Sequence, residues 1–89
     1  MKISEKKREK IYEQILAVLY SYNPKLLFTS KIAQEIARDE EFIKKLLREL
    51  KNKKVIIEVR KNVKGIDYKR RSRWKLSETA YEAYKKHQA

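Results

Sequence analysis

The stretch from Asp39 to Lys53 constrains the fold most strongly, because its apolar residues recur at the spacing of one α-helical face. At 100° per residue these side chains fall within a stripe about 140° wide, as in a helix packed on a small core. They are Phe42, Ile43, Leu46, Leu47 and Leu50. The opposite face carries Glu41, Lys44, Lys45, Arg48 and Asn52. We predict a helix over about residues 39–53 whose outer face is exposed.

The charge of the chain indicates a polyanionic partner. Lys and Arg number 24 against 12 Asp and Glu, so the formal net charge is +12. This surplus repels copies of the protein from one another and attracts polyanions, nucleic acid first among them. The 89 residues, with one Gly and one Pro, fit a single helix-rich domain, which we place over residues 1–89.

The composition argues against several classes of function. The chain has no Cys and one His, His87 near the C-terminus, and it has no Gly-rich phosphate loop. We therefore expect no enzymatic activity, no metal, no cofactor and no small-molecule substrate.

The sequence also bears on location. Its apolar runs are shorter than the ~18–20 residues of a membrane span, and residues 1–10 lack the apolar core of a signal peptide. We expect no membrane partner and a cytoplasmic, nucleoid-associated protein. Abundant Lys, Glu, Ile and Tyr without Cys resembles heat-adapted proteins and predicts thermostability.

A longer helical pattern comes first in the chain. Apolar residues from Ile11 to Tyr22 recur at helical spacing, and Ser4 is placed to cap the helix. Asn23-Pro24 ends the pattern, because proline disfavours helical geometry in the residue before it. The first helix is predicted over about residues 4–21.

A second, shorter helix follows a short apolar run at residues 26–28, which could form a minimal strand. Thr29 and Ser30 offer hydroxyls that can cap a helix over about residues 30–37. Asp39 can cap the helix after it. Two helices joined by about three residues form a candidate helix-turn-helix.

Residues 55–76 predict a hairpin that turns near Lys64-Gly65. We expect Trp74 and Leu76 of its second strand to face Ile57 and Val59 on the core side, a scheme into which Ile56 fits poorly. The outward face of the second strand then carries only basic side chains. They are Lys69, Arg71, Arg73 and Lys75.

The hairpin is also the most basic part of the chain. Between Arg60 and Lys75 eight basic residues and one acidic residue, Asp67, give a net charge of +7. Adjacent like charges repel one another, so nucleic-acid contact is the favoured interpretation, and protection of an edge strand from aggregation is the alternative. The candidate binding residues are Lys61, Lys64, Lys69, Arg70, Arg71 and Arg73.

The order and spacing of these signals resemble the winged helix-turn-helix superfamily of small transcription regulators, from about Thr29 to Ser77. The matching residues are Thr29-Ser30, Ile32-Ala33, Ile36, Asp39, Ile43-Leu47-Leu50, Lys51-Asn52-Lys53-Lys54 and Val55-Ile56. The resemblance implies a mostly helical α+β fold with a three-helix core, a two-stranded wing with a short third strand, and an extra C-terminal helix. It also implies a double-stranded DNA-binding transcription regulator whose recognition helix enters the major groove.

The chain departs from the family pattern at three positions. Ala37 stands where the family often has the turn glycine, Arg38 where it has an apolar residue, and Lys54 where it often has the glycine that ends the helix. Alanine or lysine in a left-handed conformation carries a small strain.

Further binding candidates lie on the two helices of the helix-turn-helix. Lys44, Lys45 and Arg48 can reach bases or phosphates, with Glu41 and Asn52 beside them. Glu40 and Glu41 have a simpler interpretation, in which they stabilise the start of the helix and pair with the lysines four residues on. The start of the second helix adds Ser30 and Lys31.

A final helix, capped by Ser77, is predicted over about residues 77–87. We expect a homodimer through the first and last helices, with Tyr12, Tyr20, Tyr81 and Tyr84 as interface candidates. Two other functions remain open for the same fold, an RNA- or ribosome-binding basic module and a protein-interaction module with an acidic partner.

Overall fold

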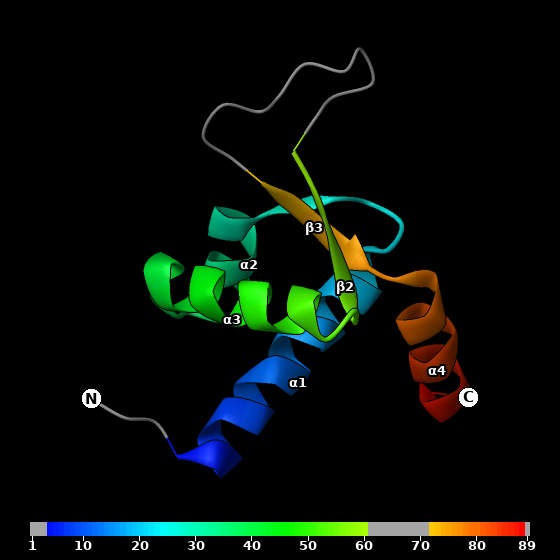
Figure 1. The fold of residues 1–89 in the computed structure, drawn as a ribbon, viewed down its shortest axis with the longest axis horizontal. Coiled ribbons are helices and arrows are strands. Elements are labelled where there is room, and N and C mark those ends of the chain that lie inside the picture. The colour runs from blue at the N-terminus through cyan, green and yellow to red at the C-terminus, as the bar shows by residue number, and fades with distance from the viewer. Residues whose placement is uncertain (1–3, 61–71, 89) are drawn as a thin grey trace.

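The computed structural model describes residues 4–60 and 72–88, which form four helices and a three-stranded antiparallel sheet (Figure 1). The elements are α1 (Glu5–Tyr22), β1 (Leu27–Phe28), α2 (Thr29–Glu35), α3 (Glu40–Asn52), β2 (Ile56–Val59), β3 (Arg73–Leu76) and α4 (Glu78–Gln88). The sheet order is β1-β3-β2. The predicted fold, mostly helical with a three-helix core, a two-stranded wing base, a short third strand and a C-terminal helix, is confirmed.

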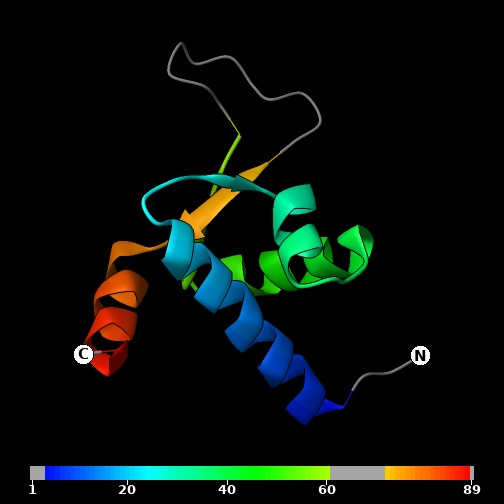
Figure 2. The same cartoon turned by 180° about the vertical axis from the view of Figure 1, so that it is seen from behind.

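The three helices of the core pack against one side of the small sheet. α3 crosses in front of α1 in Figure 1, and Figure 2 shows α1 running diagonally across the back of the molecule. Trp74, 1% exposed, lies at the centre of the core with Ile15 and Leu47. Each such buried side chain stabilises the fold by about 1.5–3 kcal/mol.

Three of the predicted helix caps are confirmed. Ser4 accepts a hydrogen bond from the Lys7 amide at 3.3 Å, and Asp39 accepts one from the Phe42 amide at 3.0 Å. Ser77 accepts one from the Ala80 amide at 3.2 Å. Each contact satisfies an amide that has no partner within its own helix.

The predicted capping of α2 by Thr29 or Ser30 is wrong. Phe28 occupies the N-cap position, and no side chain caps the helix. The Thr29 hydroxyl instead accepts a hydrogen bond of 2.9 Å from the buried indole N–H of Trp74. A buried donor without a partner is costly, so the indole takes the hydroxyl that the helix end could have used.

Ala37 and Lys54, two of the three departures from the family pattern, both adopt the left-handed conformation that favours glycine. Their φ angles are 54° and 63°. The backbone gains hydrogen bonds in return, because the amide of Arg38 donates to the Ala33 carbonyl at 3.0 Å and that of Val55 to the Leu50 carbonyl at 3.1 Å. Each of the two sharp turns therefore forms at a backbone strain energy of about 1–2 kcal/mol.

The predicted inward face of the first wing strand is also wrong. Ile56 is 1% exposed and Ile57 is 39% exposed, the reverse of the expected alternation. Ile56 pairs with Leu76 and Glu58 pairs with Trp74, and residues directly opposite in an antiparallel pair share a face. This register places Ile56 and Glu58 on the face of Leu76 and Trp74, and Ile57 on the opposite face.

Candidate nucleic-acid interface

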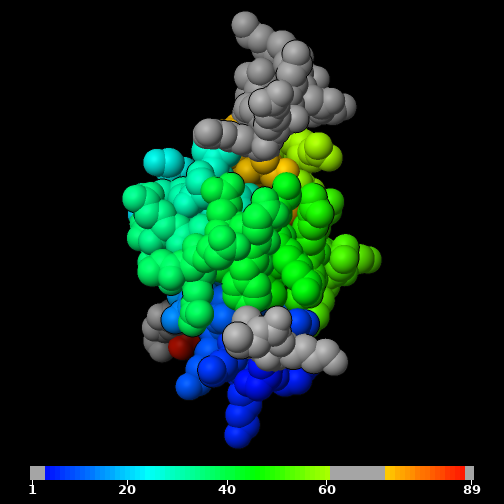
Figure 3. Space-filling view, turned by 90° about the vertical axis from the view of Figure 1, so that its left-hand side faces the viewer, coloured from blue at the N-terminus to red at the C-terminus, as the bar shows by residue number. Residues whose placement is uncertain are grey.

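The helix-turn-helix presents one continuous surface. Figure 3 shows α2 and α3 side by side, with α1 below them and the described ends of β2 and β3 above. The predicted recognition helix, about residues 39–53, is α3, which buries Ile43, Leu46, Leu47 and Leu50. Because those apolar side chains hold the inner face, the charged side chains point outward.

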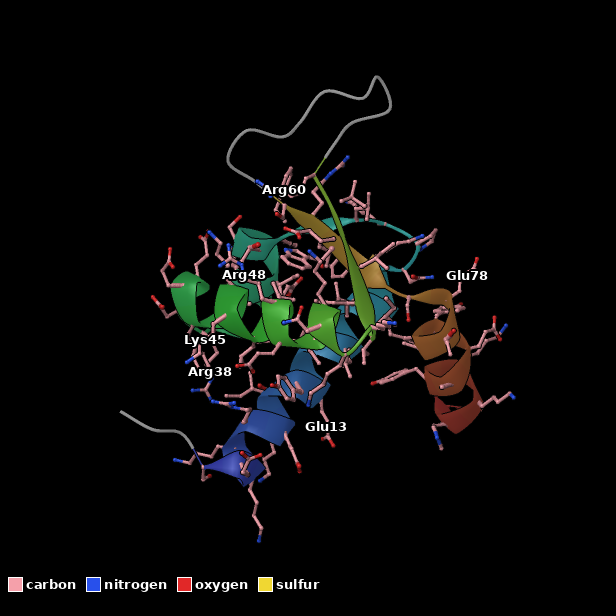
Figure 4. The ribbon with its side chains drawn as sticks, in the orientation of Figure 1. Glu13, Arg38, Lys45, Arg48, Arg60 and Glu78 are labelled. Atoms are coloured by element: carbon pink, nitrogen blue, oxygen red, sulfur yellow. The ribbon has the colours of Figure 1, made fainter. Side chains whose placement is uncertain are left out.

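All five residues predicted to bind on the recognition helix lie together. They line a shallow hollow of about 300 Å³ whose residues are Glu41, Lys44, Lys45, Arg48, Glu49 and Asn52. Lys44, Lys45 and Arg48 are exposed, and Figure 4 labels Lys45 and Arg48 on α3. The surface therefore offers cationic donors beside a carboxylate and an amide.

Glu40 and Glu41 were expected to stabilise the start of α3 and to pair with the lysines four residues on, and the first turn of α3 agrees with the first of these roles. Glu40 and Glu41 lie at the positive end of the helix, directly after the Asp39 cap. Within the described residues, however, neither forms an ion pair with Lys44 or Lys45. The lysines therefore remain exposed for other contacts.

Glu49 is a member of the surface that the sequence reasoning missed. It receives a hydrogen bond from the Tyr12 hydroxyl and lies 3.6 Å from the Arg8 guanidinium, both on α1. Burial and the Glu49 carboxylate raise the pKa of Tyr12 to about 12. The ammonium of Lys53 lies 5.0 Å from the Tyr12 ring centroid. This cluster joins α1 to the edge of the recognition helix.

The start of α2 contributes differently from its prediction. Ser30 is exposed, but Lys31 lies 3.4 Å from Glu35 and 5.7 Å from the Tyr22 ring centroid. The Tyr22 hydroxyl also donates to Glu35, and this hydrogen bond, with the nearby ammonium of Lys31, lowers the pKa of the Glu35 carboxyl. Lys31 is thus tied to a surface cluster between α1 and α2.

Of the six wing candidates, only Arg73 is described, since Lys61, Lys64, Lys69, Arg70 and Arg71 lie outside the described residues. Arg73 is half-buried, with its guanidinium carbon 5.7 Å from the centroid of the Phe28 ring. Its register partner in β1 is also Phe28. The short third strand therefore covers part of the face that was expected to be fully exposed.

At the base of the wing, Glu58 forms a second cluster absent from the sequence prediction. Its carboxylate accepts a hydrogen bond of 2.8 Å from the Lys51 ammonium and another from the Ser72 hydroxyl. Burial opposes ionisation of Glu58, but these two donors outweigh it and place its pKa below the ordinary value. Lys51 and Glu58 belong to different elements, so no helical spacing pairs them in the sequence.

The four tyrosines proposed for an interface do not form one patch. The Tyr20 ring lies 5.3 Å from that of Tyr81 and 4.7 Å from that of Tyr84, between centroids, within the same chain. Tyr12 belongs instead to the cluster around Glu49. Tyr20, Tyr81 and Tyr84 hold α4 beside the end of α1 (Figure 2).

No group of three or more His, Asp or Glu side chains in residues 4–60 and 72–88 could hold a metal ion.

In the same part of the chain, no helix is both long and apolar enough to cross a membrane.

These features define a winged helix-turn-helix fold, with α2 and α3 as the helix-turn-helix and β2 and β3 as the base of the wing. Solved structures of ZitR and MepR share it. A ZitR variant from Lactococcus lactis matches 98% of this chain at a TM-score of 0.63 and 21% identity. MepR of S. aureus in complex with DNA matches 89% at a TM-score of 0.66 and 25% identity. MepR, described as a transcription regulator of the Staphylococcus aureus multidrug efflux pump MepA, matches 86% at a TM-score of 0.61 and 24% identity.

The likeness covers only part of those proteins. This chain spans 51% of the ZitR chain and 58% and 59% of the two MepR chains. The sequence matches no protein-family model and has no significant match among curated proteins.

Proposed function

We propose that this protein binds double-stranded DNA as a transcription regulator, with α3 in the major groove. The observation that carries the proposal is the exposed hollow on α3, where Lys44, Lys45 and Arg48 project together. The similar fold of MepR, solved in complex with DNA, supports the same mode of binding. The major groove is just wide enough to admit a helix.

The side chains of the hollow suit base edges of different kinds. Arg48 and Lys44 are donors for the O6 and N7 atoms of guanine, and Asn52 can form two hydrogen bonds with adenine. Glu41 can accept a hydrogen bond from the N4 amino group of cytosine, which compensates for placing a carboxylate near phosphates.

Backbone contacts are assigned to the residues around this helix. Ser30 and Lys31 would contact phosphate from the start of α2. The wing candidates Lys61, Lys64, Lys69, Arg70 and Arg71 would follow the backbone or the adjacent minor groove. Arg60, exposed at the end of β2 and labelled in Figure 4, begins this basic stretch.

We further propose that the protein acts as a homodimer in the cytoplasm, associated with the nucleoid, without catalysis or a small-molecule substrate. The half-buried tyrosines at the junction of α1 and α4 support this choice of interface, because tyrosine is enriched where proteins meet. A two-fold symmetric dimer would present two recognition helices to paired half-sites.

The test is fluorescence anisotropy with labelled duplex DNA at several salt concentrations. If about six phosphates are contacted, log K should fall against log salt with a slope of roughly −5. A flat dependence would contradict the proposal, and preference for structured RNA at matched salt would favour the RNA-binding alternative.

Selection from a random duplex pool then tests the role of α3. Arg48→Ala should lose preference at one or two base positions, each contact being worth about 1–3 kcal/mol of discrimination. Lys85→Ala, which removes an exposed cation from α4, is the matched control and should keep the wild-type preference. An unchanged preference in Arg48→Ala would remove α3 from base recognition.

A further inference from the structure

Glu58 connects the recognition helix to the base of the wing and has no part in the proposed DNA contacts. Its side chain is 13% exposed, whereas that of its partner Lys51 is 49% exposed. Lys51 comes from the last turn of α3, and Ser72 comes directly before β3. One carboxylate thus holds a donor from each of the two parts expected to touch DNA.

Lys51 would otherwise belong to the DNA-facing surface. It follows Lys44 by seven residues and Arg48 by three, which places the three cations along one side of α3. Its half-exposed ammonium could reach a phosphate, but the Glu58 carboxylate already lies 2.8 Å away. A phosphate would have to displace a charge-assisted hydrogen bond and leave a mostly buried carboxylate with Arg60 as its remaining nearby cation.

We propose that Glu58 is a positioning residue that withholds Lys51 from DNA phosphates and ties the base of the wing to α3, which limits binding to arbitrary duplex DNA. The inference rests on the proposed DNA binding. Phosphate contacts carry no sequence information, so one contact fewer lowers affinity for all sequences alike. The protein therefore binds non-specific DNA more weakly than its charge alone would allow.

The test uses Glu58→Gln, whose amide oxygen can still accept the Ser72 hydrogen bond while the ion pair is lost. Affinity for a random-sequence duplex is measured between 50 and 200 mM salt. The slope of log K against log salt should steepen by about 0.9, the increment for one added phosphate contact. The variant should then gain roughly 3.5-fold more affinity than wild type on going from the high to the low salt.

Two controls separate the contact from net charge. Glu13→Gln makes the same change of charge on α1, where the side chain points away from α3 and the wing in Figure 4, and it should keep the wild-type slope. Glu58→Gln with Lys51→Gln should also return to the wild-type slope, because Lys51 supplies the added contact. A double variant that stays steep would overturn the inference.

The remaining outcomes are also decisive. Equal slopes for Glu58→Gln and Glu13→Gln would overturn the inference about Glu58 but leave the proposed DNA binding intact. Wild-type protein without salt-dependent binding would refute the proposed function itself. Circular dichroism checks that the variants fold. If Glu58→Gln does not fold, the slope of the Lys51→Gln variant tests the inference. A wild-type slope would support it, whereas a slope shallower by about 0.9 would overturn it, because Lys51 would then already contact phosphate in the wild type.

Discussion

At the scale of single residues, the hydrogen bond from Trp74 to Thr29 illustrates how a buried polar atom determines its surroundings. The indole lies in the centre of the core, and its N–H needs an acceptor there. Thr29 supplies it from the first residue of α2. The contact therefore fixes where α2 begins relative to the sheet.

Replacing Thr29 with Val should test this role. The change keeps the shape but leaves the Trp74 N–H buried without an acceptor, so the free energy of unfolding should fall by about 1–3 kcal/mol. Urea denaturation followed by tryptophan fluorescence measures the loss. Ser30→Ala is the matched control, because this exposed hydroxyl caps nothing and its removal should change stability by less than about 0.5 kcal/mol. Equal stability of the two variants would contradict the assignment.

At the scale of elements, α4 is short enough that its stability depends on its neighbours. It has 11 residues, and isolated helices shorter than about 12–15 residues are marginal in water. Its contacts with α1 include the rings of Tyr81 and Tyr84 on Tyr20. We infer that these aromatic contacts, beyond the Ser77 cap, keep α4 folded.

Tyr20→Ala should therefore loosen α4 specifically. Amide hydrogen exchange in α4 should rise toward the rate of an unstructured peptide, while exchange in α3 stays slow. Tyr12→Ala removes the same side chain from the same helix, but its contacts are Glu49 and Lys53. It should leave α4 protected. Unchanged exchange in α4 of the Tyr20 variant would show that other contacts hold this helix.

At the scale of the whole molecule, the proposed dimer makes a prediction about mass and target. Light scattering at micromolar concentration should give about twice the 10.8 kDa of one chain. Paired half-sites in the selected DNA should then lie about 10–10.5 base pairs apart, because two-fold symmetry places both α3 helices on one side of the duplex. A mass of one chain at every concentration, with single unpaired sites, would contradict the dimer.

Much of the molecule follows from local pattern. The stripe from Ile43 to Leu50 predicts α3, and the caps at Ser4, Asp39 and Ser77 act over three residues, so neighbouring sequence suffices to place them. The five candidate residues on α3 share one surface for the same reason.

The remaining features depend on contacts between distant parts of the chain. Residue order was enough to predict the charge, the helix order and the outward side chains of α3. Packing between distant segments turns Ile56 toward the core, brings Thr29 to Trp74, and brings Lys51 and Ser72 to Glu58. A one-residue change in pairing register moves every side chain of a strand to the other face, and a buried donor takes whichever acceptor packing brings within reach.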